Sequence, residues 1–137
     1  MQEDRTIPFG SDDPDMSAAI DTARQTIEQF LDAFFSPKDG QTAFLLKVRF
    51  ADGDQVEHVW VADLEVTEST FRGVIANEPR LSTLRFKQTV EFEPRDVTDW
   101  MFLERGKLIG GYTTRLVRQR MSAGERDAFD ASVPYSF

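Results

Sequence analysis

The chain of 137 residues has no cysteine and only one histidine, His58. The absence of cysteine excludes disulfides, thiolate nucleophiles, iron–sulfur clusters and cysteine-ligated zinc. It also fits a reducing compartment. A zinc site would need His58 together with several carboxylates, and the sequence holds no pair of histidines at helical spacing. We therefore expect no metal site and no cofactor.

Long hydrophobic runs are also missing. No apolar stretch approaches the roughly 18–20 residues that cross a membrane. The start of the chain lacks the basic segment and following apolar run of a secretory signal. We expect a soluble, cytoplasmic protein that does not act at a membrane.

Positive charge is in the minority, with 16 Lys and Arg against 24 Asp and Glu, a net charge of −8. An acidic protein repels phosphate backbones, which argues against nucleic acid as a partner. The charge is uneven, because one acid and five bases between Glu104 and Met121 give +4 and leave −12 elsewhere. We interpret this basic stretch as a solvated face with salt bridges to the acidic remainder. A site for an anion or an acidic partner is the alternative.

The length predicts a single domain, which we place at residues 13–137, after a flexible polar tail at 1–12. Asp13 is a candidate N-cap and Pro14 suits a first helical position. Apolar residues then recur at steps of three and four, which predicts one long helix from Pro14 to Phe35. Residues 36–40, with Pro37 and Gly40, end it.

From Gln41 the apolar period becomes two, which is typical of a strand with one buried face. Asp52-Gly53 predicts a hairpin into the strand QVEHVWVA. A two-residue turn pairs Phe44 with Val61, whereas a three-residue turn pairs Phe44 with Trp60. The two registers place His58 on opposite faces, so the sequence leaves its face open.

Further strands are predicted at residues 70–76, 88–93, 97–103 and 107–109, with turns near residues 68–69, at 94–96 and at Gly106. Gly73 indicates a bulge or the close approach of a large neighbour. Residues 80–87 carry no clear pattern. After Gly111 either a helix or a continued strand is compatible with the sequence, and we favour the helix, with Thr113 as its N-cap. A capping box at Ser122 predicts a short helix from Ala123 to Asp130.

This order of elements favours an α+β fold. We expect a long N-terminal helix, about six antiparallel strands in a strongly curved sheet or partly open barrel, and short C-terminal helices.

No reaction is evident among the chemically capable residues. Glu57 and His58 are adjacent on a strand and point to opposite faces. The spacing of ADGDQVE differs from that of a calcium loop, and no glycine-flanked serine marks a nucleophile. A Ser-His-Asp arrangement would have to use His58, for example with Asp99. We assign no catalytic residue and lean towards a protein that is not an enzyme.

Aromatic residues form the more informative set. A buried tryptophan needs a partner for its indole N–H. We interpret Trp60 and Trp100 as core residues. The alternative is a pocket lined by both tryptophans and Tyr112, on which the side chains of His58, Asp99 and Asn77 converge.

The stretch DWMFLERGKLIGGYTTR, from Asp99 to Arg115, is interpreted as the closing hairpin of this core. Trp100 and Met101 are expected on opposite faces. The pair Gly110-Gly111 relieves crowding where the chain bends past Trp100 or enters a helix. If a helix begins near Thr113, its free N–H groups and Arg115 are able to hold an anion.

Several motifs resemble one family. DDPDM, KVRF-ADGD-QVEHVWV, Asn77-Glu78-Pro79, VTDWMFL and GKLIGGYTTR are similar to the YegJ-like bacterial domains of unknown function, over a region from Asp12 to about Phe129. The family domain also occurs attached to ankyrin repeats. The family pattern often has a glycine just before the strand at 88–93, where this chain has Lys87. The resemblance implies a soluble bacterial protein and gives no catalytic residue. It places motif positions at Glu57, His58, Trp60, Asn77, Asp99, Trp100, Gly111, Tyr112 and Thr113.

Two functional hypotheses follow. The first is a non-catalytic binding module that recognises another protein, in an accessory, stress-linked or immunity-type role. The alternative is a small-molecule-binding or hydrolytic protein with a pocket around His58, Asp99, Trp60 and Trp100. The candidate binding residues for either are Glu57, His58, Trp60, Asn77, Asp99, Trp100, Tyr112, Thr113 and Arg115.

Overall fold

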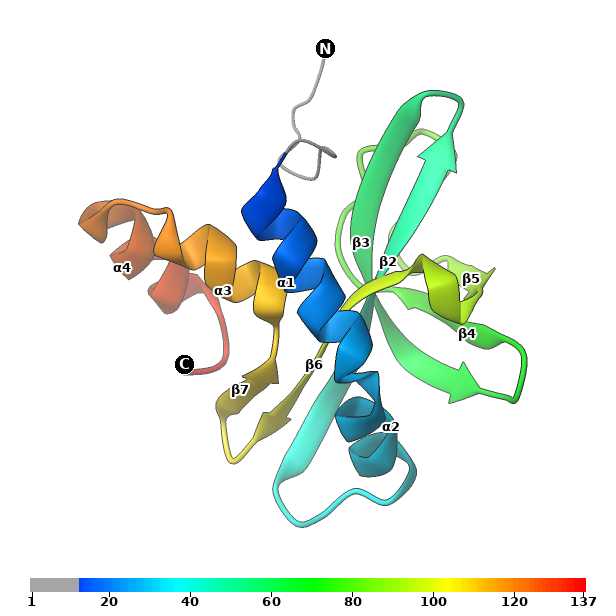
Figure 1. Ribbon diagram of the computed structural model, residues 1–137, viewed down its shortest axis with the longest axis horizontal. Coiled ribbons are helices and arrows are strands. Elements are labelled where there is room, and N and C mark those ends of the chain that lie inside the picture. Colours follow the sequence, from blue (N-terminus) through cyan, green and yellow to red (C-terminus); the bar gives the residue numbers. More distant parts are fainter. Residues whose placement is uncertain (1–12) are drawn as a thin grey trace.

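The computed structural model describes residues 13–137, so the predicted tail at 1–12 lies outside the described residues. Within these residues, α1 and α2 come first, the strands follow, and α3 and α4 come last (Figure 1). This order confirms the α+β class. The elements are α1 (Pro14–Gln25), α2 (Ile27–Phe35), β2 (Gln41–Asp52), β3 (Gln55–Val66), β4 (Phe71–Ile75), β5 (Thr89–Phe92), η1 (Pro94–Asp96), β6 (Val97–Glu104), β7 (Lys107–Gly110), α3 (Tyr112–Gln119) and α4 (Ala123–Ser132).

The six strands form one antiparallel sheet in the order β5-β4-β3-β2-β6-β7. After the meander from β2 to β5, the 3₁₀ turn η1 returns the chain to the free edge of β2, where β6 pairs. Bulges between Thr42 and Leu45 and between Ala62 and Glu65 contain Ala43 and Asp63, both with positive φ. Such bulges bend and twist a sheet. The sheet is curved and remains open.

The predicted long N-terminal helix is divided in two at Thr26. The Thr26 hydroxyl donates to the carbonyl of Thr22 at 2.7 Å and accepts from the indole Nε1 of Trp100 at 3.1 Å. A threonine that bonds its own helix in this way bends the helix. The apolar stripe predicted over the whole segment is retained, because Met16, Ala23 and Phe30 are all buried.

The hairpin between β2 and β3 follows neither of the two expected registers. Asp52 pairs with Gln55, so the two-residue loop is Gly53-Asp54, one position later than predicted. Gly53 adopts a positive φ of 63°, as the first loop position of a type II′ turn requires. Lys47 therefore pairs with Trp60, and His58 pairs with Arg49.

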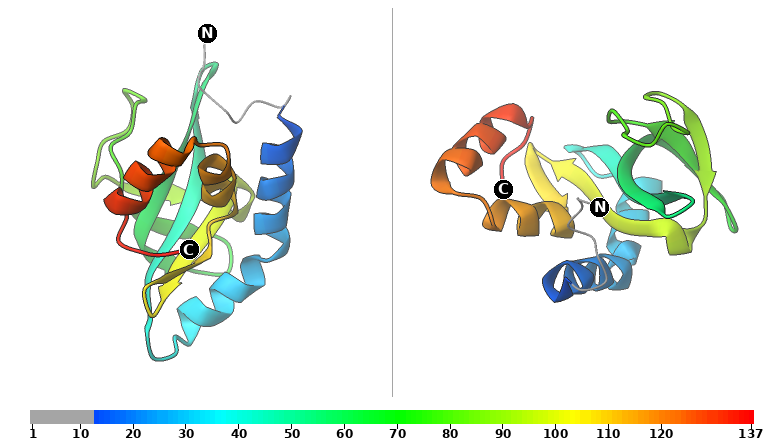
Figure 2. Two further views of the ribbon diagram at one scale, coloured as in Figure 1. Left: turned by 90° about the vertical axis from the view of Figure 1, so that its left-hand side faces the viewer. Right: turned by 90° about the horizontal axis from the view of Figure 1, so that it is seen from above.

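Apolar side chains pack on both faces of the sheet. The larger core lies under α1 and α2 and includes Phe30, Val48 and Trp100. A smaller cluster on the other face holds Met101, Leu103 and Leu108, with Trp60 and the C-terminal aromatics packed against it. Figure 2 shows α1 and α2 along one side of the sheet and α3 and α4 beside the β7 end. Trp100 and Met101 thus lie on opposite faces, as predicted.

Glycines permit the closing hairpin to follow its path. Gly106 forms its turn with Arg105, and both residues have positive φ. A Cβ on Gly110 would lie 2.5 Å from the ring of Trp100, and one on Gly111 would lie 2.8 Å from the side chain of Leu108, so both glycines relieve crowding, Gly110 against Trp100 and Gly111 against Leu108. A Cβ on Gly73 would lie 2.5 Å from Val61, so Gly73 marks a close approach.

The C-terminal helices settle the choice left open by the sequence. The chain after Gly111 is helical, and α3 begins at Tyr112 with Gly111 in the N-cap position. Thr113 therefore lies inside the helix and is not its N-cap. The capping box predicted for α4 is present, with Ser122 and Glu125 bonding to each other's backbone N–H.

Candidate functional site

A row of three strand residues crosses the sheet on the face away from α1. Lys47 at the centre pairs with Trp60 of β3 on one side and with Asp99 of β6 on the other. Lys47 is only 9% exposed and Asp99 is fully buried. A lysine and an aspartate are therefore held next to each other inside the protein, where charged groups are costly unless they are paired and hydrogen-bonded.

The Asp99 carboxylate is bonded to the start of α3. Its Oδ1 accepts from the backbone N–H of Trp100 at 2.8 Å and of Tyr112 at 3.1 Å. Its Oδ2 accepts from both the backbone N–H and the hydroxyl of Thr113. Gly111 has no side chain with which to cap this helix, so a carboxylate from a neighbouring strand satisfies its first N–H groups.

Burial determines the ionisation of both charged groups in the row. Burial raises the pKa of Asp99, and the hydrogen bonds from Thr113 and the charge of Lys47 oppose this rise. Burial lowers the pKa of Lys47 to about 8, while the nearby Asp99 carboxylate opposes this change. Each group therefore stabilises the charge of the other, but only in part offsets the loss of water.

Lys47 also contacts two neighbours on the same face. Its Nζ lies 3.1 Å from Thr113 Oγ1, so the lysine, the threonine hydroxyl and Asp99 form one chain of hydrogen bonds. The ammonium group lies 5.4 Å from the centre of the Trp60 ring, within the range of a cation–π interaction. The ring of Trp60 is half-buried.

His58 lies on this same face, beside the bulge of β6. Its Nδ1 lies 3.0 Å from the hydroxyl of Thr98, which is the extra residue between the pairs that Lys47 and Val48 form with β6. Burial lowers the pKa of His58 to about 3, and the positive charges of Lys47, Arg49 and Arg24 lower it further in that order. The imidazole is therefore neutral near pH 7.

Glu57 and Asn77 hold the connection between β4 and β5. The Glu57 carboxylate accepts from the backbone N–H of Arg80 at 2.8 Å and of Leu81 at 2.9 Å. Asn77 Oδ1 accepts from the backbone N–H of Trp60 at 2.7 Å. Both side chains thus bind backbone groups of the fold.

Trp60 and Trp100 lie on opposite faces of the sheet and do not line one pocket, which was the alternative to their interpretation as core residues. Trp100 is fully buried in the core under α1, where its indole donates to the carbonyl of Ala23 and to the Thr26 hydroxyl, both at 3.1 Å. Tyr112 packs edge-on against it at 5.8 Å. Trp60 lies on the other face of the sheet with Lys47. Successive strand residues point to opposite faces, so Asp99 shares the face of Trp60 and not that of Trp100.

The groups of the alternative anion site are bonded within the chain. Asp99 accepts from the first N–H groups of α3, where the alternative interpretation placed an anion. Arg115 donates from Nε to the carbonyl of Gly110 at 2.8 Å and from Nη2 to the carbonyl of Leu108 at 2.7 Å. A carboxylate of the protein itself thus takes the position of the anion.

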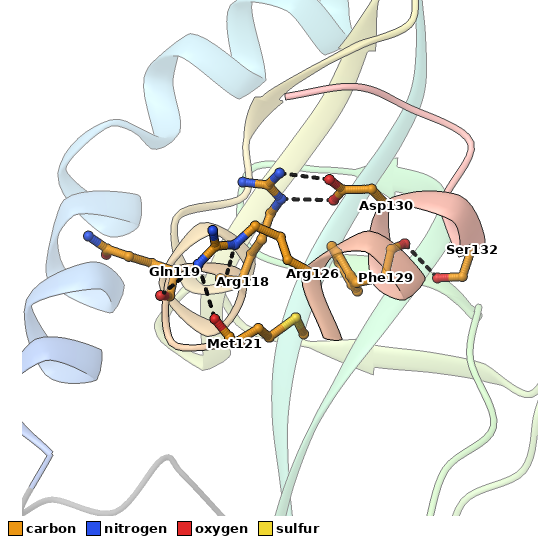
Figure 3. A network of polar contacts seen from close by, with 7 residues as sticks. All are labelled: Arg118, Gln119, Met121, Arg126, Phe129, Asp130 and Ser132. Atoms are coloured by element: carbon orange, nitrogen blue, oxygen red, sulfur yellow. Dashed lines mark hydrogen bonds and ion pairs between the residues drawn. The ribbon is translucent and has the colours of Figure 1, made fainter. Parts of the chain in front are cut away.

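The basic stretch forms ion pairs, as its solvated-face interpretation predicts. Arg118 and Asp130 form a two-bonded pair at 2.7 and 2.8 Å (Figure 3). Arg120 bonds both carboxylate oxygens of Asp13 at 2.9 Å. These pairs attach α3 to α4 and to the start of α1.

Sequence reasoning missed Lys47, although it is the centre of the cluster. The available signal was a lysine in the middle of the apolar strand FLLKVRF, where a surface interpretation was the simpler one. Within residues 13–137, no group of three or more His, Asp or Glu side chains is arranged to hold a metal ion. None of the helices in that range is long and apolar enough to cross a membrane.

The fold and this cluster together define a small α+β protein in which a curved open sheet carries a buried Lys–Asp–Thr cluster that fixes a helix. The chain belongs to the family described as an uncharacterised protein conserved in bacteria, DUF2314, whose model matches residues 13–137.

Two relatives are similar to this chain. The uncharacterised protein YegJ of Escherichia coli strain K12 is 33% identical over 111 residues, which cover 80% of this chain and 71% of that protein. A protein of Neisseria meningitidis serogroup B that is named for ankyrin repeats is 30% identical over 131 residues. These cover 89% of this chain and 51% of that protein, so the chain spans about half of its length. No solved structure matches the chain.

Proposed function

We propose that the protein is a non-catalytic binding module that recognises another protein. The observation that supports this proposal is that the candidate acidic groups already form hydrogen bonds that stabilise the fold. The Asp99 carboxylate is bonded to the start of α3, and the Glu57 carboxylate to the loop after β4. A nucleophile or general base has to reach a substrate, and groups that already accept several backbone bonds inside the protein are poorly placed to do so.

The surface of the sheet and helices offers contacts of the kind that partners use. Phe35 at the end of α2 is 60% exposed, and Phe86 in the loop before β5 is 45% exposed. Exposed aromatic side chains are enriched at protein interfaces, where they provide large contact areas. The net charge of −8 favours a partner with a basic surface.

The test is affinity capture with the purified protein as bait, followed by reconstitution with the purified captured protein. The baits are the wild type, Phe35→Asp, Phe86→Asp and the control Ser69→Asp, which adds the same charge at an exposed turn. We expect an equimolar partner that binds the wild type and the control, and that one of the phenylalanine variants loses. Folded baits that all retain or all lack the partner would contradict the proposal.

The alternative function, small-molecule binding, is supported by one observation. Trp60 and His58 are half-buried on the face that carries the buried amine of Lys47, so parts of two rings remain accessible beside a basic group. A ligand screen by NMR separates this function from the first. Ligand-induced shifts confined to the Trp60 indole and the His58 ring would favour the alternative.

A further inference from the structure

The outer edge of β7 is covered by the chain itself. Residues 133–137, here called the tail segment, run beside β7 in the parallel direction, with Ser136 opposite Lys107. The backbone N–H of Leu108 donates to the carbonyl of Ser136 at 2.8 Å, and the N–H of Ser136 donates to the carbonyl of Gly106 at 2.9 Å. The tail segment therefore extends the sheet by one short strand, as peptides do when they bind to a sheet edge.

The two aromatic residues on either side of Ser136 also pack against the rest of the protein. Tyr135 and Phe137 both pack against the cluster of Met101, Leu103 and Leu108. The ring of Phe137 lies 4.4 Å from the guanidinium of Arg118 and 5.7 Å from that of Arg115. It also lies 6.1 Å from the ring of Phe129 on α4. Arg115, Arg118 and Phe129 thus form a site for an aromatic side chain next to the edge of β7.

The two arginines of this site are held in position by hydrogen bonds that do not involve the tail segment. Asp130 holds the Arg118 guanidinium through two hydrogen bonds (Figure 3). Arg115 is held by the carbonyls of Leu108 and Gly110, so those edge carbonyls already accept a side chain. The part of the edge that bonds a strand is therefore short, between Gly106 and Leu108. We call Gly106–Leu108, Arg115, Arg118 and Phe129 the edge slot.

The tail segment itself is only partly buried. Two backbone hydrogen bonds join it to β7, and both of its aromatic rings are only half-buried. Pro134 and Ser136 are exposed. Segments with few buried contacts open locally at a small fraction of the free energy of global unfolding. The arginines and the phenylalanine of the edge slot, in contrast, belong to α3 and α4.

We propose that the edge slot is the recognition site for an extended segment of a partner protein, in which two aromatic residues flank one small residue, and that the tail segment occupies it in the absence of that partner. The inference rests on the proposed binding function and names the class of partner. Tyr135-Ser136-Phe137 is the sequence that the slot is seen to accept. A tethered segment competes at an effective concentration in the millimolar range, so weakly matching segments are excluded.

The experiment uses the full chain and a labelled peptide with the sequence of residues 131–137. Ser136→Pro removes the N–H that donates to Gly106 and loosens the tail segment, and the double variant Tyr135→Ala, Phe137→Ala serves if the proline variant does not fold. We expect the peptide to bind the loosened chain at least about tenfold more tightly than the wild type, since the tethered competitor is weakened. A control peptide with alanine in place of both aromatics should not bind. Adding Arg118→Gln to the loosened chain should abolish binding.

Three results would overturn the inference. A folded, loosened chain that binds neither peptide shows that the slot accepts no separate segment. Equal peptide affinity for the wild type and the loosened chain shows that the tail segment does not occupy the slot. Concentration-dependent dimers of the wild type that Arg118→Gln abolishes would assign the slot to a second copy. If capture succeeds while the peptide fails, the binding function stands and only the slot is wrong.

Discussion

Asp99 on β6 binds Thr113 on α3 through both the backbone N–H and the hydroxyl of the threonine. The two residues are 14 positions apart, and between them lie the closing hairpin and the glycine pair. Gly111, the N-cap residue of α3, has no side chain to accept from the first N–H groups, so this carboxylate fixes where α3 starts. Sheet and C-terminal helices are therefore joined by one buried acid.

Replacing Asp99 should be among the most destabilising single changes in the chain. Asp99→Ala leaves the N–H groups of Tyr112 and Thr113 without their acceptor and removes the negative charge that stabilises the ammonium group of Lys47, so we expect a loss of about 3–5 kcal/mol. Asp99→Asn keeps one acceptor oxygen and should lose less. Urea denaturation measures both. Glu91→Ala, at an exposed position of β5, is the control and should change stability by less than about 0.5 kcal/mol. Equal stability of Asp99→Ala and the control would refute the capping role.

Substitutions of two glycines in the closing hairpin distinguish the cost of backbone strain from the cost of steric crowding. Gly106 and Gly110 have nearly the same φ, 81° and 77°. A Cβ on Gly106 would meet nothing within 4 Å, whereas one on Gly110 would lie 2.5 Å from both the ring and the carbonyl of Trp100. Gly106→Ala should cost about 1–2 kcal/mol from its left-handed backbone alone. Gly110→Ala should cost at least about 1–3 kcal/mol more, because the core has to move. Thermal denaturation of both variants measures the two losses of stability. Equal losses would contradict the prediction.

His58 should make the protein lose stability in acid. The pKa is about 3 in the folded protein against 6.5 in the unfolded chain, so between these values the unfolded state binds more protons. Stability should then fall with falling pH by up to about 1.4 kcal/mol per pH unit. Burial raises the pKa of Asp99, which acts in the opposite direction. The measurement is therefore the difference in free energy of unfolding between the wild type and His58→Gln, from pH 7 to pH 4. Asp99 is present in both proteins, so its contribution cancels. A constant difference across that range would contradict the burial of a neutral imidazole.

Lys47 should titrate near pH 8, well below an ordinary lysine, because burial lowers its pKa. NMR of the lysine side-chain carbons should show one resonance with a midpoint near 8, and Lys47→Arg should remove it. Between pH 8 and 10.5 the unfolded state binds the additional proton, so this group makes the protein more stable as pH rises in that window. A midpoint near 10.5 would show that the ammonium group is solvated.

Lys87 occupies a backbone conformation that favours glycine. Its φ is 70°, and it lies two positions before β5, near the place where the family resemblance implies a glycine. The left-handed conformation costs a residue with a Cβ roughly 1–2 kcal/mol, and the greater freedom of glycine in the unfolded chain returns about half of that. Lys87→Gly should therefore stabilise the protein by roughly 0.5–1 kcal/mol. Lys107→Gly, within β7, is the matched control and should destabilise it.

Local patterns predicted most of the elements correctly. The change from a helical period to a period of two placed β2, and the capping box at Ser122 placed α4. These features depend on neighbours within a few positions, which is why a single sequence reveals them. The break at Thr26 was not predictable in this way, since it involves the indole of Trp100, which is 74 residues away.

The candidate site shows the same limit more strongly. The sequence singled out His58, Trp60 and Asp99, and all three lie on one face. It also grouped Trp100 with them, although the face of each residue depends on the hairpin register and on a bulge at Thr98. Lys47 was overlooked because its burial depends on neighbours from two other strands, Trp60 on β3 and Asp99 on β6. Pairing across a sheet has no local signature.

The position of β2 in the sheet has a consequence for synthesis. One edge of β2 pairs with β3 directly after it, but the other edge has to wait for β6, which ends at Glu104. A ribosome adds about 5–20 residues per second, so the 52 residues from Asp52 to Glu104 take roughly 3–10 s. During that time Leu46 and Val48 belong to a strand with an unpaired edge. The nascent chain is therefore most prone to aggregation before its last strands emerge, and chaperones that act on unfinished chains should matter more than those that act on the released protein.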